Sequence, residues 1–202
     1  MWRSRNAAAV LALLLALAIV LVDASSSGAA TTKIGLAQQP SITVQTGQTF
    51  YLTVAVNDVT DLYGWQFDVE YNSTYLEFVK VVEGPMLRSD GAMTFFVPPT
   101  TEPGKVLHPA ATRLAPADTG VDGSGDIAYV FFRALKDTNG TTVTVKNAML
   151  VDRNALEISK DYINGGRCTV IISSAAPVYV QPPIEGEGEE FTYLPLVLRP
   201  AG

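Results

Sequence analysis

The chain has 202 residues, a formal net charge of −6 and 48% hydrophobic residues. This charge excludes a nucleic-acid-binding surface, because phosphate binding needs a basic patch and the Lys and Arg residues are scattered singly. Once the two ends are set aside, about 140 residues remain, which is the size of one ordinary domain with one core.

The N-terminal segment, residues 1–24, has the pattern of a secretion signal peptide. Arg3 and Arg5 form a basic start, residues 7–22 are an uninterrupted apolar run, and Val22-Asp23-Ala24 offers a cleavage site. The alternative is a retained membrane anchor, but the run is shorter than the ~20 apolar residues of a usual spanning helix. Both readings predict export, to the extracellular space or the cell surface. Membrane contact is expected only through this segment, if it stays uncleaved.

Two strands are expected early in the folded domain. Residues 25–32 are small and polar and predict a mobile lead-in, and a first strand lies within residues 33–44, with Ile42 and Val44 inward. A second strand starts at residue 50, where apolar and more polar side chains alternate. Its inward residues are Phe50, Leu52, Val54 and Val56. Residues 57–61 predict a turn.

The next strand, residues 62–71, organises the fold. Tyr63, Trp65, Phe67, Val69 and Tyr71 share one side of an extended chain. Such a large apolar face needs a second sheet to cover it, because a lone hairpin has no surface wide enough. The sequence therefore predicts a β-sandwich, and the opposite, polar face of this strand is the first candidate working surface.

The strands that follow are shorter or less regular. In residues 76–82 the apolar parity changes, which predicts a bulge that switches faces. Residues 93–97 and 105–113 are short apolar segments with nearby prolines, which suits edge strands. Residues 115–125 are rich in Gly, Pro and Asp and predict a loop.

The last strands carry strong apolar patterns. Residues 126–135 are apolar on both faces, and residues 142–149 alternate with Val143 and Val145 inward. Asn164-Gly165-Gly166 leads into a final strand with Cys168, Val170 and Ile172 inward. No segment has helical periodicity, so an all-β sandwich of about nine strands is expected over residues 33–173.

The C-terminal end changes composition. Residues 174–190 are rich in Pro, Glu and Gly and predict a linker, and residues 191–202 form an apolar tail too short to span a bilayer. By parity, Tyr51, Tyr129 and Phe131 point outward from the sheet opposite the working face. An outward aromatic cluster marks something that covers it, so we expect the tail (residues 191–198) or another protein to pack there.

No pattern of a catalytic centre is visible. A nucleophilic hydrolase needs a base beside its nucleophile, and His108 is the only histidine. Cys168 is the only cysteine, which excludes an intrachain disulfide and a His/Cys metal cluster. The Asp- and Gly-rich loops at residues 58–61 and 118–125 lack the alternation of an EF-hand. We expect no enzyme activity, no metal and no cofactor.

The order of these pieces resembles the cohesin domain of bacterial cellulosome scaffolds, over roughly residues 33–173. The matching stretches are Trp65-Gln66-Phe67-Asp68-Val69-Glu70-Tyr71-Asn72, Gly125-Asp126-Ile127-Ala128-Tyr129-Val130-Phe131-Phe132 and Asn164-Gly165-Gly166. The resemblance implies a nine-stranded jelly-roll sandwich that binds a dockerin domain through the outer face of one sheet. Where many members carry an Asn and an Asp on the central strand, this chain has Gly64 and Gln66.

The partner-binding surface predicted from this resemblance combines two strands. Its residues are Gly64, Gln66, Asp68, Glu70, Thr142, Thr144 and Lys146. The leading interpretation is an exported, non-catalytic module that binds a dockerin-like protein and so attaches polysaccharide-degrading enzymes. The alternatives are a carbohydrate-binding module, in which Trp65 would stack on sugars although its parity places it in the core, and a cell-surface structural domain.

Overall fold

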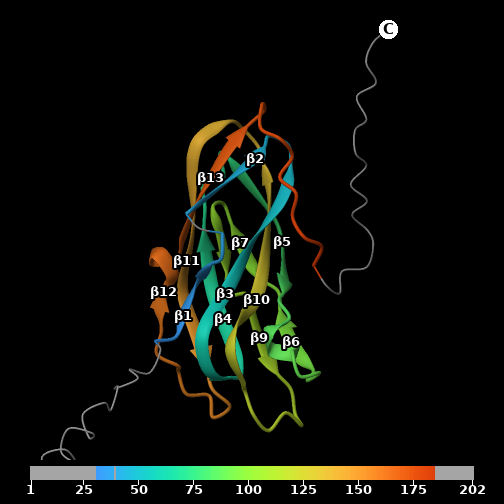
Figure 1. Cartoon of the computed structure of the whole chain (residues 1–202), viewed down its shortest axis with the longest axis vertical. Helices are drawn as coiled ribbons and strands as arrows, with labels where there is room; N and C mark the ends of the chain where they lie inside the picture. Colours follow the sequence, from blue (N-terminus) through green and yellow to red (C-terminus); the bar gives the residue numbers. More distant parts are fainter. Residues whose placement is uncertain (1–30, 39, 185–202) are drawn as a thin grey trace, which may run out of the picture. The chain divides into compact units, whose positions relative to one another are not determined.

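The computed structural model describes residues 31–38 and 40–184, and their fold is an all-β sandwich of two sheets (Figure 1). This part of the chain contains 13 strands and two short 3₁₀ helices, η1 (Met86–Arg88) and η2 (Ile163–Gly166). The all-β, two-sheet prediction is confirmed. The predicted signal peptide (residues 1–24) and apolar tail (residues 191–202) lie outside the described residues. Within those residues, no helix is both long and apolar enough to cross a membrane.

One sheet has five strands in the order β12-β1-β3-β10-β5. Their bounds are β12 Asp161–Tyr162, β1 Lys33–Leu36, β3 Thr49–Leu62, β10 Val121–Ala134 and β5 Leu76–Glu83. Two 14-residue strands, β3 and β10, pair along most of their length and form the centre of this sheet.

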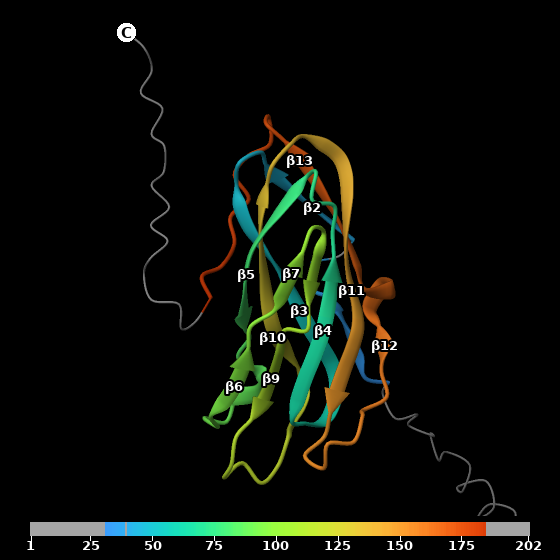
Figure 2. The same cartoon turned by 180° about the vertical axis from the view of Figure 1, so that it is seen from behind.

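The other sheet has eight strands, with a main path β2-β13-β11-β4-β8-β7 and with β9 pairing to both β4 and β6. Their bounds are β2 Ser41–Gln45, β13 Arg167–Ser173, β11 Thr138–Val151, β4 Gly64–Glu70, β8 Lys105–Leu107, β7 Thr100–Glu102, β9 Ala110–Arg113 and β6 Thr94–Val97. Figure 2 shows β11, β4 and β9 side by side on this face of the molecule.

The core lies between the two sheets, as the alternation predicted. On β4, Trp65, Phe67 and Val69 are 3%, 0% and 0% exposed, and the Trp65 and Phe67 rings stack with centroids 5.2 Å apart. The inward residues predicted on the second and last strands, from Phe50 to Val56 and from Cys168 to Ile172, are also buried. The parity change in β5 is confirmed as a bulge, because the pairing with β10 shifts register between Phe131 and Phe132.

Several element boundaries differ from the sequence predictions. The turn predicted at residues 57–61 is wrong: β3 continues to Leu62, with Asp58 and Asp61 at positive φ of 53° and 56° where its register with β10 shifts. The loop predicted at residues 115–125 ends at Gly120, because β10 already starts at Val121. The C-terminal end of β3 and the N-terminal end of β10 are therefore strand, although their side chains do not alternate between apolar and polar.

The edge assignment for residues 105–113 is also wrong. This segment forms β8 and β9, which follow one another along β4 and are each covered on the far side by β7 or β6. Pro109 lies in the gap between β8 and β9, so its missing N–H removes no ladder hydrogen bond. The segment at 93–97 does form an edge strand, β6, which pairs with β9 alone.

Candidate docking face

The predicted working surface lies on β4 and β11. In the structure β9 and β6 continue the same sheet beside β4, and we call the outer face of β11, β4, β9 and β6 the docking face (Figure 2). Register places the residues predicted on β4 and β11 next to one another: Thr144 pairs with Glu70, and Lys146 pairs with Asp68. The structure therefore brings the two predicted strands together, and it divides their outer face into two halves of different chemistry.

The polar half contains Glu70, Thr142, Thr144 and Lys146 on neighbouring strands. Lys146 Nζ and Glu70 Oε2 form an ion pair, and both side chains are nearly half exposed. Beside them, an open hollow of about 720 Å³ runs over the end of the sheet and is lined by Glu70, Thr142 and Thr144 among others. These side chains can supply hydrogen bonds and charge to a partner, although an exposed ion pair adds little stability.

Asp68 sits on the same face but is bound within the protein. It is 7% exposed, its Oδ1 accepts a hydrogen bond from the backbone N–H of His108 at 2.9 Å, and its Oδ2 accepts one from Asn147 Nδ2 at 2.8 Å. His108 and Asn147 both have positive φ, at 58° and 47°. Asp68 therefore holds the irregular backbone on both sides of β4, and its burial makes it a poor primary contact for a partner.

The apolar half contains Gly64 and Gln66 of β4, Phe95 and Val97 of β6, and Met149 of β11. Phe95, Val97 and Met149 are 58%, 42% and 42% exposed, which is unusual for large apolar side chains that lie on one face. They surround a hollow of about 190 Å³ whose lining contains no charged side chain. A Cβ on Gly64 would lie 3.1 Å from the Ala111 carbonyl oxygen, so the missing side chain helps to keep the hollow open.

Local backbone irregularity explains why Met149 is exposed. The register of β11 against β4 shifts between Lys146 and Met149, with Asn147 in the left-handed region between them. Because of this bulge, Val145 and Ala148 both face the core, and the side chain of Met149 points outward. Asn tolerates positive φ better than most residues, so the sequence permits the bulge at this position.

Phe95, Val97 and Met149 were not predicted to lie on this face. The sequence did indicate that Phe95 and Val97 could lie outside the core, because β6 has apolar residues on both of its faces. Phe96 lies between them and points to the inner side, with its ring 6.3 Å from Trp65. For Met149 there was no direct signal, because the alternation of residues 142–149 breaks at Asn147 without a Gly or Pro to mark it.

A buried arginine anchors the loop that precedes the apolar half. Arg113, 3% exposed at the end of β9, donates from Nη1 to the Leu87 carbonyl at 2.5 Å and from Nη2 to Asp90 Oδ2 at 2.6 Å. The Arg113 guanidinium lowers the pKa of Asp90 to about 2, mainly through these side-chain hydrogen bonds. This contact fixes the segment between β5 and β6, and β6 carries Phe95.

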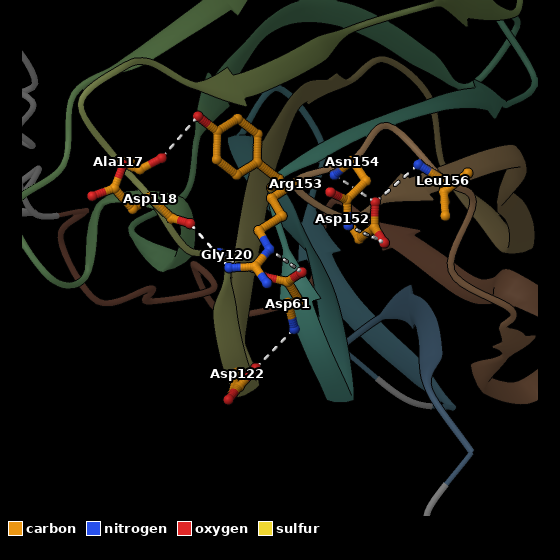
Figure 3. A network of polar contacts seen from close by, with 10 residues as sticks. Asp61, Ala117, Asp118, Gly120, Asp122, Asp152, Arg153, Asn154 and Leu156 are labelled. Carbon is orange, nitrogen blue, oxygen red and sulfur yellow. Dashed lines mark hydrogen bonds and ion pairs between the residues drawn. The ribbon is translucent and has the colours of Figure 1, made fainter.

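A polar network ties together three connections at one end of the sandwich (Figure 3). The Asp61 carboxylate accepts the Gly120 N–H at 2.7 Å and lies 3.6 Å from Arg153 Nε, while Arg153 Nη1 donates to the Asp118 carbonyl at 3.2 Å. The Asp-containing end of β3 and the loop before β10 thus meet, through hydrogen bonds and an ion pair. Across the described ranges, no three His, Cys, Asp or Glu residues are grouped so that they could hold a metal ion.

The second predicted surface lies on the outer face of the five-stranded sheet. Tyr51, Tyr129 and Phe131 form one cluster and are 9%, 8% and 8% exposed. They are covered by residues 178–184, which we call the strap, and its last residue, Ile184, packs against the cluster. The strap belongs to the stretch predicted as a linker, whereas the tail expected to cover the cluster, residues 191–198, lies outside the described residues.

Comparison with known proteins points to one family. A family model described as the cohesin domain matches residues 37–170. Among curated proteins, none matches this sequence. Several solved structures share the fold. A non-cellulosomal cohesin from the hyperthermophilic archaeon Archaeoglobus fulgidus is 18% identical, with a TM-score of 0.55 over 72% of this chain and 93% of its own.

Two further structures are complexes. A type I cohesin–dockerin complex from Clostridium thermocellum contains a chain that is 12% identical, with a TM-score of 0.54 over 71% of this chain and 100% of its own. A type II cohesin–X-dockerin complex from Acetivibrio cellulolyticus contains a chain that is 18% identical, with a TM-score of 0.55 over 70% of this chain and 95% of its own. At these identities the likeness concerns the fold.

Proposed function

Because this chain belongs to the cohesin domain family, we propose that it is a non-catalytic module that binds a dockerin-type protein through the docking face. Solved relatives of the same fold are described in complex with dockerins. The docking face offers what a protein interface needs: an apolar patch for the centre of the contact and a polar rim beside it.

The observation that carries this proposal is the gathering of exposed apolar side chains on one sheet face. Phe95, Val97 and Met149 come from strands far apart in the sequence, yet they surround one hollow. Leaving such side chains in water has no benefit for a monomer, whereas transferring them from water into an interface is favourable by about 25 cal/mol per Å² of apolar area, before the entropic costs of association are subtracted. Gly64 lets the partner approach the backbone closely.

A sugar-binding function has less support. In the carbohydrate-binding alternative Trp65 would be the stacking platform, but its side chain is 3% exposed and packs against Phe67 and Phe96. A buried indole cannot present its face to a sugar ring.

Export of the module is part of the proposal. It rests on the N-terminal sequence, where a basic start precedes the apolar run of residues 7–22. Fractionation of cells that produce the full chain, with N-terminal sequencing of the mature protein, tests it. Recovery of the uncleaved chain in the cytoplasm would contradict export. The proposed attachment of polysaccharide-degrading enzymes outside the cell requires that the module is exported.

Calorimetric titration of the full chain against a panel of dockerin domains tests the binding function. We expect at least one dockerin to bind, and we expect Phe95→Asp to abolish the heat of binding, because it places a charge in the centre of the apolar half. Glu77→Gln is the control, since Glu77 is exposed on β5 in the other sheet and its ion pair with Arg133 is long, at 4.0 Å. Absence of binding across the panel, or equal binding by Phe95→Asp, would contradict the proposal.

A further inference from the structure

The strap occupies the side of β3 that β1 leaves open. β1 pairs with β3 from Lys33 opposite Asn57 to Leu36 opposite Val54, and the chain then crosses to the other sheet as β2. The backbone N–H and carbonyl of Tyr51 and Thr53 therefore need partners other than a strand, because buried backbone groups without a partner are costly. The Ala37 N–H reaches the Thr53 carbonyl at 2.9 Å, where the β1 segment ends.

Glutamine side chains complete this edge. Gln38 Oε1 accepts the Thr53 N–H at 2.8 Å, and further along the strand Gln181 of the strap binds both backbone groups of Tyr51, each at 2.7 Å. A carboxamide presents one acceptor and two donors, so it imitates the N–H and C=O pair of a neighbouring strand.

The pairing between the strap and the sheet is reciprocal. Gln48, which precedes β3, accepts the Tyr179 N–H at 2.9 Å and donates to the Tyr179 carbonyl at 2.5 Å. The Tyr51 hydroxyl donates to the Pro182 carbonyl at 2.8 Å, and Ile184 packs against Tyr51, Tyr129 and Phe131. Figure 1 shows the strap as the orange-red segment that descends along this side of the sandwich.

Proline suits the strap at these positions. Pro182 and Pro183 have no N–H to satisfy, and their fixed φ keeps the segment extended before it binds, which lowers the entropy lost on docking. Val178 and Val180, by contrast, are 53% and 86% exposed. Tyr179 and Gln181, which alternate with these two valines, contact the sheet, as in the recognition of an extended peptide by a sheet edge. Beyond Gln181 the alternation ends, because the Pro182 carbonyl and Ile184 both contact the sheet.

We propose that the outer face of the five-stranded sheet, from Gln48 and Tyr51 to Tyr129 and Phe131, is a binding groove for an extended peptide that contains glutamine and proline. Residues 178–184 of this chain are its resident ligand. The site is independent of the docking face, which belongs to the other sheet, and the strap lies beyond residues 37–170 that match the family model.

The strap can leave the groove without disturbing the strand that precedes it. β13 ends at Ser173, and Ser174 is anchored separately, since the Asp137 carboxylate accepts its N–H at 3.0 Å and its hydroxyl at 2.9 Å. Residues 175–177 connect this anchor to the strap. The groove and its ligand thus behave as two binding partners joined by a short connection.

Amide hydrogen exchange of the full-length chain, measured residue by residue by NMR, tests the proposal. A strap-weakened variant carries Gln181→Ala and Ile184→Asp, and we expect exchange at the Tyr51 amide to be at least about tenfold faster than in the unmodified chain. Gln38→Ala is the matched control, because it removes the same kind of contact from Thr53: exchange at Thr53 should rise while Tyr51 stays protected. Circular dichroism checks that both variants are folded.

Complementation in trans then tests whether the groove binds a separate peptide. A synthetic peptide of residues 177–184, added to the strap-weakened variant, should restore Tyr51 protection as its concentration rises, and the same peptide with Gln181→Ala should not. Unchanged Tyr51 exchange in the strap-weakened variant would overturn the proposal. So would failure of the unmodified peptide to restore protection at millimolar concentration, or equal restoration by both peptides.

Discussion

Asn147 donates a hydrogen bond from Nδ2 to Oδ2 of Asp68 at 2.8 Å, which links the bulge in β11 to the centre of β4. The other oxygen of Asp68 receives the N–H of His108 from the break between β8 and β9. Both donors belong to residues at positive φ. One buried carboxylate therefore fixes two irregular strands against the same neighbour, and the apolar half of the docking face begins directly beyond them.

We expect Asp68→Ala to lower the free energy of unfolding by about 1–3 kcal/mol, because it leaves two donors without their acceptor. Urea unfolding followed by circular dichroism measures this change. Glu70→Ala is the matched control on the same strand. Its ion pair with Lys146 is nearly half exposed, so its removal should cost less than about 1 kcal/mol. Equal costs for the two variants would contradict the assigned role of Asp68.

The two halves of the docking face should contribute unequally to partner binding. Phe95→Ala removes the largest exposed apolar side chain beside the hollow, and we expect it to weaken a bound dockerin at least about tenfold. Thr142→Ala, at the exposed rim of the polar half, should change the affinity less than about threefold. Titration calorimetry with the same dockerin compares them. A larger loss for Thr142→Ala would place the centre of the interface in the polar half.

Much of the fold follows from alternation, since burial is decided by side-chain parity wherever the strands are regular. Trp65, Phe67 and Val69 face the core because neighbouring residues of a strand point to opposite sides, and the outward position of Tyr51 and Phe131 follows from the same rule. The bulge in β5 could be predicted because apolar residues change parity there. The jelly-roll architecture was predicted from the order of the segments, which resembles that of the cohesin domain.

The apolar half of the docking face could not be predicted in the same way. Met149 points outward because Asn147 adopts a positive φ, and a single Asn in a strand does not specify that conformation. The docking of the strap on the sheet could not be predicted for a different reason. Gln181 binds backbone groups of Tyr51, and such pairing leaves no hydrophobic pattern in the sequence. Pro182 and Pro183 instead suggested a free linker.

The contact between Arg113 and Asp90 should depend on pH. The pKa of Asp90 is lowered from 3.8 to about 2, so the stabilisation is complete above pH 3.8 and is lost as the pH falls through about 2. NMR titration of the Asp90 carboxyl measures this pKa directly. Asp90→Asn removes the charge and should make the exchange of loop amides between β5 and β6 faster at neutral pH. A carboxyl that titrates at its ordinary value would contradict the assigned contact.

Cys168 should behave as a small apolar side chain of β13. It is 1% exposed, and burial raises the pKa of its thiol to about 11, so the reactive thiolate is scarce at pH 8. We expect a thiol-reactive reagent to label the unfolded chain in urea rapidly and the folded chain only as fast as the domain opens. Cys168→Ser should lower the stability by about 1–3 kcal/mol, because the Thr169 carbonyl lies 3.7 Å from Sγ, too far for a normal hydrogen bond from a buried hydroxyl, whereas Cys168→Ala removes only a small apolar contact. Equal losses of stability for the two substitutions would contradict the apolar surroundings assigned to this side chain. Rapid labelling of the folded protein would contradict its burial.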